Sequence, residues 1–540
     1  MSQTISGKPT EVDAVIVGAG LSGLYMLYKL RRLGITARVC ETGPDVGGTW
    51  YWNKYPGARC DVQSMHYSYS FDDELEQEWE WTEKFPGQPE LLKYIQHVAD
   101  RHDLRRDIQF NTRVTSARFQ DDSSRWSVKT EQGEEFSAQY FIMAVGCLSR
   151  PKALEVPGLE MFTGQTYHTA SWPETGVDFT GRRVAVIGTG SSGIQAIPLI
   201  AQEAAELTVF QRTANYCLPT FNGPIDQEMV AHVKANYSET READRNSGFG
   251  VAVEVGEESA FADSDEERRA KYQDRWNQGN LTGILQAYSD VLVDVAANDT
   301  AAEFVREQIR QIVTDPRTAD MLSPKGYPFG TKRPCLGTGY YETFNRENVR
   351  LVDLRETPLI EITDRGVRTS ESEFEVDALV LATGFDAMTG SFLAIDVRGR
   401  DGVSLQEKWV DGPSSYLGIS VPGFPNMFTI TGPGSPSVLS NMLVSIEQHV
   451  DWLADMIAHL QHEDLSVVES TEVAAKEWDE HVKECSEATL YAVTESWYMG
   501  ANVPGKPRVF MPYSGGVDAY RDKCNQVAAD GYPGFDLRSA

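Results

Sequence analysis

The chain has few positive charges, no cysteines at C-x-x-C spacing and no long apolar run. Each of these absences excludes a class of protein. Its 49 lysines and arginines stand against 79 acidic residues, a formal net charge of −30, so the surface repels nucleic acid and anionic lipid. The seven cysteines are scattered and never spaced as C-x-x-C, which argues against a disulfide framework and a zinc site and favours a reducing cytoplasm. No apolar run reaches the ~18 residues of a membrane span, and the first residues do not resemble a secretory signal. We therefore expect a cytoplasmic protein that has no metal and whose partners are neither nucleic acid nor membrane.

What the sequence does contain is a dinucleotide-binding fingerprint near its start. The apolar run 12–17 turns at Gly18, Gly20 and Gly23 into a segment of helical periodicity. Glycines permit the tight turn, and the N-terminus of the helix receives a pyrophosphate. Glu41 ends the next apolar run, 23 residues after Gly18, and a carboxylate there accepts hydrogen bonds from a ribose 2′-hydroxyl and repels a 2′-phosphate. The pattern predicts a site for an adenine dinucleotide without that phosphate, the alternative being a glycine-rich turn with no ligand.

A second fingerprint repeats the first with its charge reversed. Gly188, Gly190 and Gly193 stand in the same order. The position 23 residues after Gly188 holds the neutral Gln211, and Arg212 follows it. A neutral residue removes the repulsion and an arginine pairs with phosphate, so this site should prefer NADPH. Without the fingerprint, Arg212 would be interpreted as a solvated arginine at the end of a strand.

Each fingerprint has a later closing segment. Residues 140–146 and 378–384 are short apolar runs that end in glycine, typical of buried parallel strands. The predicted fold is α/β, with two Rossmann-like dinucleotide-binding domains: the NADP domain is inserted in a discontinuous FAD domain, and a helical insertion accompanies it. The expected parts are 1–146 (FAD domain, first part), 147–180 (linker), 181–224 (NADP domain, first part), 225–332 (helical insertion), 333–384 (NADP domain, second part) and 385–540 (FAD domain, second part).

The helical insertion combines an apolar stripe with a polar interruption. Residues 301–313, AAEFVREQIRQIV, repeat apolar side chains at helical spacing around Phe304, Val305 and Ile309, which predicts one buried face. Residues 245–267 predict a polar loop. We expect the insertion to pack against the domains and to shape one wall of the site, without an activity of its own.

Two adenine dinucleotide sites, one that rejects a 2′-phosphate and one that accepts it, indicate FAD reduced by NADPH. A disulfide reductase needs a redox cysteine pair near the first site, and only Cys60 lies there. The residues alone therefore leave dioxygen, a quinone or a second protein as the electron acceptor.

The segment 162–173, FTGQTYHTASWP, resembles the fingerprint F-x-G-x-x-x-H-x-x-x-W-P of the type I Baeyer–Villiger monooxygenases. The matching positions are Phe162, Gly164, His168, Trp172 and Pro173. A second family signature is similar to Gly47, Gly48, Trp50, Tyr55, Pro56, Gly57 and Asp61, with Lys54 where the family usually has arginine. Lysine keeps the charge and loses the planar fork of arginine. The resemblance covers essentially the whole chain and is closest to the phenylacetone monooxygenase branch, with cyclohexanone and steroid monooxygenases as more distant relatives.

The resemblance implies an enzyme that uses FAD, NADPH and dioxygen to turn ketones into esters or lactones through a flavin peroxide. Arg333 matches the family's active-site arginine, which would hold the peroxide anion and stabilise the charge that grows on the former carbonyl oxygen. Asp61 matches the carboxylate beside it and would orient the guanidinium. Without the resemblance, a structural salt bridge is the simpler interpretation of this pair.

The segment 162–173 would, by the same resemblance, join two domains that shift relative to each other. Gly164 would permit unusual backbone angles, and Trp172 with Pro173 would fix the exit of the segment. His168 would tie the linker to the domains by hydrogen bonds, as a buried structural histidine, and not transfer protons to the substrate.

The fingerprints and the resemblance together assign side chains to three binding sites. The FAD site would be formed by Gly18, Gly20, Gly23, Glu41, Gly48, Thr49, Trp50 and Asp61. The NADP site would be formed by Gly188, Gly190, Ser191, Ser192, Gly193, Gln195, Arg212, Thr213, Lys332, Arg333 and Trp497. The substrate pocket would be formed by Thr49, Val62, Cys147, Leu148, Ser437, Val438, Leu439 and Met442. The loop 436–441 keeps the length seen in the phenylacetone branch, which favours a pocket open to aryl-substituted and bulky ketones.

Two other functions remain as alternatives. A related flavin monooxygenase that oxygenates nitrogen or sulfur would need the arginine less, and a flavoprotein reductase would pass electrons to a partner. The pair of Arg333 with Asp61 favours ketone oxygenation over the first alternative, and the complete segment 162–173 weighs against the second. The expected partners are a small-molecule ketone and dioxygen, and nothing in the sequence indicates an obligate protein partner.

Overall fold

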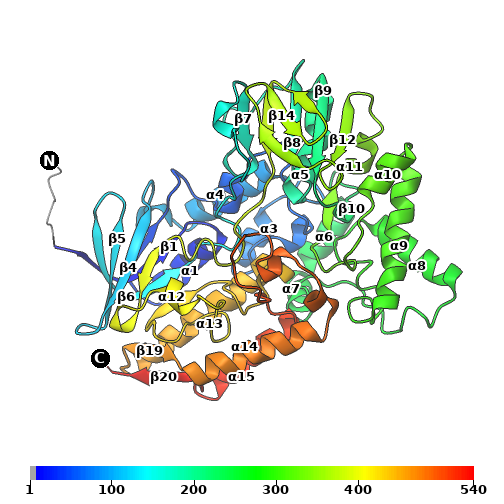
Figure 1. The fold of residues 1–540 in the computed structure, drawn as a ribbon. Helices are drawn as coiled ribbons and strands as arrows, with labels where there is room; N and C mark the ends of the chain where they lie inside the picture. The colour runs from blue at the N-terminus through cyan, green and yellow to red at the C-terminus, as the bar shows by residue number, and fades with distance from the viewer. Residues whose placement is uncertain (1–7, 540) are drawn as a thin grey trace.

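Two β-sheets organise the molecule in the computed structural model, which describes residues 8–539 (Figure 1). The first sheet has the strand order β17-β4-β5-β6-β1-β2-β3, and β18 also pairs with β6. Strands β1, β2, β3, β6 and β18 run parallel, whereas β4, β5 and β6 form an antiparallel meander. The strand bounds are β1 Thr10–Val17, β2 Ala37–Cys40, β3 Ile108–Gln109, β4 Val114–Gln120, β5 Arg125–Thr130, β6 Glu135–Met143, β17 Asp396–Arg398 and β18 Met427–Thr429.

The second sheet is entirely parallel, with the order β12-β9-β8-β16-β7. Its strands are β7 Gln165–His168, β8 Arg183–Ile187, β9 Glu206–Gln211, β12 Val349–Asp353 and β16 Ala378–Leu381. The two predicted closing segments are confirmed as strands, because β6 lies beside β1 and β16 beside β8 in parallel register. The segment expected as a linker does more than connect, since β7 forms an edge of this sheet.

In each sheet, the strand that opens the fingerprint is followed by the helix that the fingerprint predicts. Helix α1 (Leu21–Arg32) follows β1, and α5 (Ser191–Glu203) follows β8. The later part of the chain returns to the first sheet through α13 (Met442–His462), which packs against α1. Buried apolar side chains of α1 and α13 meet in one core, so residues more than 400 positions apart stabilise the same domain. The predicted α/β fold with two dinucleotide-binding domains, the second inserted in the first, is confirmed.

The insertion is helical, as predicted, and flanks both sheets (Figure 1). Its helices are α6 Gln227–Ala235, α7 Tyr237–Arg245, α8 Asp265–Gln278, α9 Val295–Ile312 and α10 Pro316–Leu322. The predicted stripe of α9 is buried at Phe304, Val305 and Ile309. Helices α8 and α9 lie at one side of the molecule, whereas α6 and α7 approach its centre.

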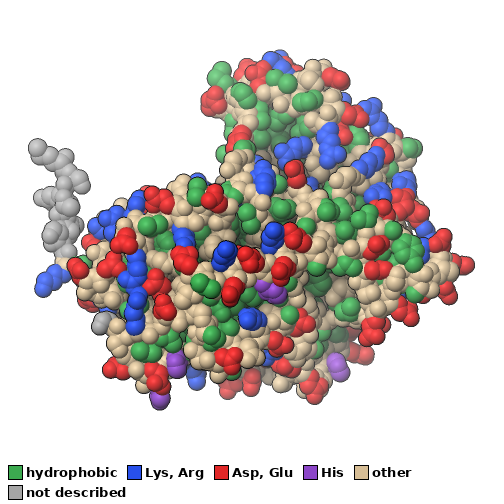
Figure 2. All heavy atoms as spheres, turned by 60° about the horizontal axis from the view of Figure 1, so that its bottom comes forward, with side chains coloured by type: hydrophobic (Ala, Val, Ile, Leu, Met, Phe, Trp, Pro, Cys, Tyr) green, Lys and Arg blue, Asp and Glu red, His purple; other side chains and the backbone are tan. Residues whose placement is uncertain are grey.

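The remaining elements are short or lie toward the C-terminus. The helices are α2 Thr49–Trp52, α3 Asp73–Glu78, α4 Gln88–Arg101, α11 Tyr340–Thr343, α12 Leu405–Lys408, α14 Glu472–Glu487 and α15 Val517–Ala529. The strands are β10 Cys217–Pro219, β11 Cys335–Gly337, β13 Leu359–Ile362, β14 Gly366–Thr369, β15 Glu373–Glu375, β19 Val467–Ser470 and β20 Phe535–Arg538. Acidic and basic side chains are interspersed over the face seen in Figure 2. Among residues 8–539, no helix combines the length and apolar composition that a bilayer crossing requires.

Candidate active site

Arg333 and Asp61 form a bidentate ion pair at the centre of the molecule. The guanidinium Nε donates to Asp61 Oδ2 at 3.0 Å, and Nη2 donates to both carboxylate oxygens at 2.8 Å. Nη1 donates to the carbonyl oxygen of Val438 at 2.6 Å. Burial lowers the pKa of Arg333, but the charge of Asp61 raises it further, so the net shift is upward. The guanidinium is therefore a permanent cation with a fixed orientation.

The hydrogen-bond partners of Arg333 leave part of its donor capacity free. A guanidinium has five N–H donors. Asp61 takes the Nε and Nη2 side of the fork, and the Val438 carbonyl takes one donor of Nη1. At least one further N–H of Nη1 remains for a ligand. Arg333 and Asp61 both line one cavity, which we call the Arg333 cavity, so a ligand inside it can reach this donor.

Several chain segments that are distant in sequence form the walls of the Arg333 cavity. Of the eight predicted pocket residues, Val62, Val438 and Leu439 line it. The insertion supplies a wall that includes Phe249 and Leu285, in keeping with the predicted role of the insertion. Further lining residues that the sequence did not reveal are His66, Phe85, Val251, Ala252, Val253, Leu281, Tyr491 and Tyr498.

Part of the predicted polar loop 245–267 therefore contributes apolar side chains to the cavity. Phe249 and residues 251–253 come from this loop. The composition of the short sequence FGVAV was the available signal, although the segment has no periodic pattern: four of its five residues are apolar, which is uncommon in a fully solvated loop.

The other five predicted pocket residues lie outside the cavity lining. Cys147, Leu148 and Met442 pack with Val438 and Leu439 in a hydrophobic cluster behind it. Thr49 is exposed at the start of α2. Ser437 is fully buried with a φ of +41°, and its hydroxyl has no hydrogen-bond partner among residues 8–539. A buried hydroxyl without a partner is costly unless a ligand satisfies it.

The first fingerprint has the geometry of a phosphate cradle. Gly18 has a φ of +102°, and a Cβ added there would lie 2.6 Å from the carbonyl oxygen of Ala144. A Cβ on Gly48 would lie 2.8 Å from the Cα of Gly20, so only glycine allows these two loops to approach. Helix α1 starts at Gly20 with no side-chain cap, which leaves its first backbone N–H groups available to an anion.

Glu41, at the end of the second strand, is held in place by this loop. Its carboxylate accepts from the backbone N–H groups of Ala19 and Gly43, at 2.7 Å each. Burial raises the pKa of Glu41, while these backbone donors lower it. A carboxylate has about four lone-pair sites, so two remain for a ribose. Trp50, also predicted for this site, is buried and donates from its indole nitrogen to the hydroxyl of Tyr67 at 3.3 Å.

The second fingerprint repeats this geometry with more open space. Gly188 has a φ of +111°, and a Cβ there would lie 2.4 Å from the carbonyl oxygen of Ala382. A Cβ on Gly193 would lie 2.3 Å from the carbonyl oxygen of Gly188, which explains the close approach of α5 to the sheet. Gly190 has no atom within 4 Å of an added Cβ and starts α5 without a side-chain cap.

The helices of the chain differ in their caps. Helices α8, α9, α10, α13 and α14 each begin with a side chain that accepts from a backbone N–H. Helices α4 and α15 also begin after a glycine without a side-chain cap, so in α1 and α5 it is the glycine turn together with the missing cap that leaves the first N–H groups to a ligand. A dinucleotide pyrophosphate satisfies those N–H groups, so the residues present fit two dinucleotides.

Three cations gather at the end of the second fingerprint. Burial, and after it the charges of Arg212 and Arg355, lower the pKa of Lys332. Arg355 Nη2 donates to the hydroxyl of Thr213 at 3.2 Å. Among residues 8–539, none of these cations has an ion pair with a carboxylate. Like charges held together without a counter-ion are unfavourable, and a 2′-phosphate would neutralise them. Arg355 was missed because it follows a later strand, β12, and belongs to no motif.

The other residues predicted for the NADP site are placed less directly. The side-chain amide of Gln195 is hydrogen-bonded to the first domain. Its Oε1 accepts from the hydroxyl of Tyr55 at 2.8 Å, and its Nε2 donates to the carbonyl of Arg59 at 3.1 Å. No described contact joins Gln195 to Arg212 or Lys332. Gln195 therefore links the two domains and is not placed as a phosphate ligand.

Ser191 and Trp497 lie beside segments that the sites use. Ser191 is the first residue of α5, and its Oγ is 3.2 Å from the thiol of Cys335. Ser192 follows Ser191 in the same turn. The ring of Trp497 lies tilted against that of Tyr498, with ring centroids 4.3 Å apart. Its segment contacts the Arg333 segment, because the hydroxyl of Thr494 donates to Thr331 at 2.8 Å.

The segment 162–173 is fixed by hydrogen bonds of His168. Nδ1 accepts from the backbone N–H of Ala170 at 3.1 Å, so Nε2 carries the proton of the neutral ring. Nε2 lies 3.2 Å from the carbonyl oxygen of Lys152 and 3.1 Å from the hydroxyl of Thr383. Burial lowers the pKa of His168, which keeps the ring neutral. This geometry is that of a structural tie.

Gly164 is required in this segment for a reason other than the expected one. Its φ is not among the positive values that favour glycine. A Cβ there would instead lie 2.6 Å from the carbonyl oxygen of Asp377 and 2.4 Å from the ring of Phe162. Space, not backbone angle, excludes a side chain. Trp172, followed by Pro173, is buried against Tyr167 and Phe179.

Lys54, the departure from the family signature, contacts the end of the same segment. Its Nζ is 2.8 Å from Glu174 Oε1 and 4.0 Å from the centre of the Tyr51 ring. The hydroxyl of Tyr51 donates to the same carboxylate oxygen at 3.0 Å. A single ammonium is sufficient for this contact, so the loss of the arginine fork leaves an ion pair between the first domain and the segment.

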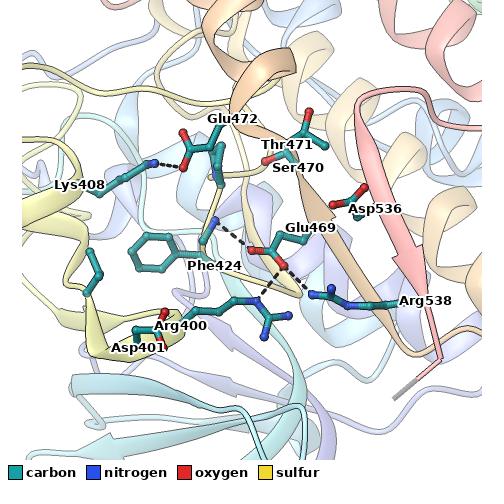
Figure 3. A pocket seen from close by; sticks show the side chains of 13 residues that line it. Arg400, Asp401, Lys408, Phe424, Glu469, Ser470, Thr471, Glu472, Asp536 and Arg538 are labelled. Atoms are coloured by element: carbon teal, nitrogen blue, oxygen red, sulfur yellow. Dashed lines mark hydrogen bonds and ion pairs between the residues drawn. The ribbon is translucent and has the colours of Figure 1, made fainter.

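A wider cavity of about 440 Å³ lies elsewhere, at the C-terminal strands (Figure 3). Glu469 accepts from Arg400 at 3.0 Å and from Arg538 at 2.8 Å, and Lys408 pairs with Glu472. Its cations are therefore neutralised within the cavity. It contains none of the residues that the motifs single out, and we assign the chemistry to the Arg333 cavity.

Comparison with known proteins finds relatives along the whole chain. Residues 15–262 match a family model described as pyridine nucleotide-disulphide oxidoreductase. A phenazine N-monooxygenase of Lysobacter antibioticus is 42% identical over 538 residues, 99% of this chain and 98% of its own. A methyl acetate-forming acetone monooxygenase of a Gordonia species is 41% identical over 531 residues, 98% of this chain and 99% of its own. The solved structure of an oxidised steroid monooxygenase bound to NADP is 50% identical, covers 98% of this chain and all of its own, and superposes with a TM-score of 0.95.

Proposed function

The chain belongs to the type I Baeyer–Villiger monooxygenases, and from this premise we propose that Arg333 and Asp61 carry its catalysis. It is a flavoprotein that uses FAD, NADPH and dioxygen to convert ketones into esters or lactones. The observation that supports the assignment of Arg333 is its bidentate pair with Asp61, which leaves a free donor at the cavity that both residues line.

The role we propose for Arg333 is electrostatic. When FAD is bound and reduced it supplies activated oxygen for attack on the ketone carbonyl. The former carbonyl oxygen then gains negative charge, and a fixed cationic donor stabilises that charge without having to reorient. Asp61 contributes by holding the guanidinium plane. The apolar walls of the Arg333 cavity strengthen the interaction because they exclude water.

Coenzyme recognition, in our proposal, is divided between the two fingerprints. The first, with Glu41 and the glycine pair Gly20 and Gly48, holds FAD. The second, with Gly190 at the open end of α5, holds the pyrophosphate of NADPH. Arg212, Lys332 and Arg355 bind its 2′-phosphate, with the hydroxyl of Thr213 oriented by Arg355.

We propose a substrate range that includes aryl-substituted and bulky ketones. Four aromatic side chains line the Arg333 cavity, and they offer flat apolar surface to a ring: Phe85, Phe249, Tyr491 and Tyr498. We further propose that the enzyme works in the cytoplasm without an obligate protein partner. All seven cysteines are free, which is the usual state in a reducing compartment.

Oxygenation of nitrogen is a second candidate activity, and one observation favours it. The relative that is 42% identical along the whole chain is a phenazine N-monooxygenase. Nitrogen in an aromatic ring is a nucleophile, so its oxygenation places no growing negative charge on a carbonyl oxygen. Arg333 would then matter much less than in ketone oxygenation.

The test is a panel of linear, cyclic and aryl ketones, together with phenazines, incubated with the FAD-loaded enzyme, NADPH and air. We expect products 16 mass units heavier from ketones, with the fragmentation of esters or lactones. Conversion of phenazines but of no ketone would assign the second activity. NADPH consumption with hydrogen peroxide as the only product from every compound would contradict both.

A further inference from the structure

A histidine–aspartate pair lies in the wall of the Arg333 cavity, apart from Arg333 and Asp61. His66, in the turn 64–66, lines the cavity, and its Nδ1 is 2.8 and 3.0 Å from the two carboxylate oxygens of Asp244. Asp244 is on α7 of the insertion, and its side chain is fully buried. The pair therefore joins the first domain to the insertion at the surface of the cavity.

The surroundings of Asp244 fix which nitrogen of His66 bears a hydrogen. The carboxylate also accepts from the backbone N–H of Ala252 at 2.9 Å. A buried carboxylate needs donors, so Nδ1 of His66 must be the protonated nitrogen. The backbone of His66 is held as well, because Asn441 Nδ2 donates to its carbonyl oxygen at 2.7 Å. The ring is thus oriented from two sides.

The second ring nitrogen of His66 is left without a protein partner. Among residues 8–539, no hydrogen bond to Nε2 is present, although the ring is only 19% exposed. The cavity lining combines apolar side chains, among them Val251 and Leu281, with polar ones such as Gln63 and Asn280. A largely buried ring nitrogen without a partner is unfavourable unless a ligand bonds to it. Because only Nδ1 of the ring is hydrogen-bonded within the described protein, Nε2 is left to bond to the substrate.

We propose that His66, positioned by Asp244, binds a hydroxyl group of the substrate and makes the enzyme selective for hydroxylated ketones. This inference rests on the proposed ketone oxygenation and names its substrate class. A hydroxyl group suits the site because it can donate a hydrogen bond to Nε2 of the neutral imidazole and can accept one from Nε2 of the protonated imidazolium. His66 makes no described contact with Arg333, so it determines specificity and takes no part in the oxygen chemistry.

The test compares 4-phenylbutan-2-one with its three isomers that carry one ring hydroxyl, because the isomers place the hydroxyl at different distances from the carbonyl. We expect the wild-type enzyme to favour at least one isomer about fivefold to tenfold in kcat/KM over the unsubstituted ketone. The hydrogen bond is made before and during the reaction, so the preference should appear in KM and leave kcat nearly unchanged. The same preference should appear in Kd, measured by calorimetry on the FAD-loaded enzyme.

The deciding variants are His66→Leu and His66→Gln. Leucine has a similar size but cannot form the hydrogen bond, so the ratio of kcat/KM between the favoured hydroxylated isomer and the unsubstituted ketone should fall to about one, whatever the turnover of the unsubstituted ketone. Glutamine supplies a donor and an acceptor and should restore part of the preference. FAD content and melting temperature, measured for each variant, exclude a folding defect.

Two outcomes would overturn the proposal. One is a wild-type enzyme that favours no hydroxylated isomer, and the other is His66→Leu with the wild-type preference. Failure of every protein to oxygenate the unsubstituted ketone is a different result, because it removes the proposed function, and the Kd values would still decide the role of His66.

Discussion

At the scale of single residues, the sites depend on cations held against the acidic balance of the chain. The formal net charge is −30, yet Arg212, Lys332 and Arg355 meet at one place and form no ion pair within the described part of the chain. Arg333 differs from these three, because Asp61 neutralises and orients it. The unpaired cations suit a dianionic phosphate that stays bound by charge. The paired one suits a transient oxyanion that must be stabilised but then released.

Replacement of Arg333 should separate oxygenation from coenzyme reduction. Arg333→Ala should bind FAD and be reduced by NADPH, yet form ester about 10²–10³ times more slowly, because a donor to a developing oxyanion is lost. Arg333→Lys keeps the charge but cannot contact Asp61 and the substrate together, so it should be badly impaired as well. Stopped-flow reduction and product analysis measure the two steps. Ester formation by either variant near the wild-type rate would refute the proposed role.

Replacement of the phosphate-binding cations should alter coenzyme preference. Arg212→Ala should raise KM for NADPH roughly tenfold, since a charge-assisted hydrogen bond contributes about 1.5–3 kcal/mol. Arg355→Ala should raise it as well, because its guanidinium belongs to the same group of cations. KM for NADH should not change in either variant. Arg317→Ala is the matched control, because Arg317 is an exposed arginine that pairs with Glu356. Equal losses with both coenzymes would show that these arginines stabilise the fold and do not bind the phosphate.

At the scale of elements, the sequence predicted what depends on local backbone geometry. The glycine turns, the helices after them and the closing strands were accessible because a positive φ or a close approach requires glycine at fixed spacing. The partner of Arg333 was accessible only through the resemblance. Arg355, His66 and Phe249 were not accessible, because each reaches its site through tertiary packing of a segment that carries no periodic signal. For the same reason β7 was taken for a linker: its four residues become a strand only beside β16.

Helix α13 carries a buried histidine whose titration should be visible in stability. Burial lowers the pKa of His449 to about 3. Nδ1 accepts from the backbone N–H of Thr431 at 3.1 Å, and Nε2 is 2.7 Å from the hydroxyl of Tyr520, so the neutral ring is satisfied. The unfolded chain takes up a proton near pH 6.5 and the folded one does not, so this residue lowers stability as pH falls from about 6.5 toward 3. Above pH 6.5 it has no such effect.

His449→Gln should isolate this contribution. Glutamine offers an acceptor and a donor at similar positions but does not titrate. Between pH 8 and 5 the melting temperature of the variant should fall less than that of the wild type, since about 1.4 kcal/mol per pH unit is removed below pH 6.5. Other titrating groups contribute equally to both proteins. His462→Gln is the control, because His462 is exposed at the end of the same helix. Parallel pH profiles for His449→Gln and the wild type would contradict the prediction.

At the scale of the whole molecule, α7 connects three parts of the chain that form the Arg333 cavity. Arg241 on this helix donates to Glu76 at 2.8 Å and to the hydroxyl of Ser68 at 2.6 Å. Arg245 donates to the hydroxyl of Ser70, and Ser70 in turn donates to Glu447 of α13. The loop that lines the cavity follows α7 directly, so these contacts hold the wall in place. The insertion thus forms part of the proposed substrate site and supplies neither Arg333 nor Asp61.

The buried pair of Arg241 and Glu76 should therefore couple stability to ketone binding. Their side chains are only 5% and 6% exposed, so Arg241→Met leaves a buried carboxylate without its counter-ion and should destabilise the protein by about 3–5 kcal/mol. The double variant Arg241→Met, Glu76→Leu removes both charges and should regain most of this loss. Chemical unfolding measures the difference, with Arg310→Met as the control, because Arg310 is a half-exposed arginine on α9 that pairs with Glu303.

In Arg241→Met, KM for the ketone should rise because the cavity wall loosens, whereas the rate of flavin reduction by NADPH should stay near that of the wild type, since both fingerprints lie on other segments. If flavin reduction fell as far as ketone binding, α7 would stabilise the molecule in general and would not serve the cavity in particular.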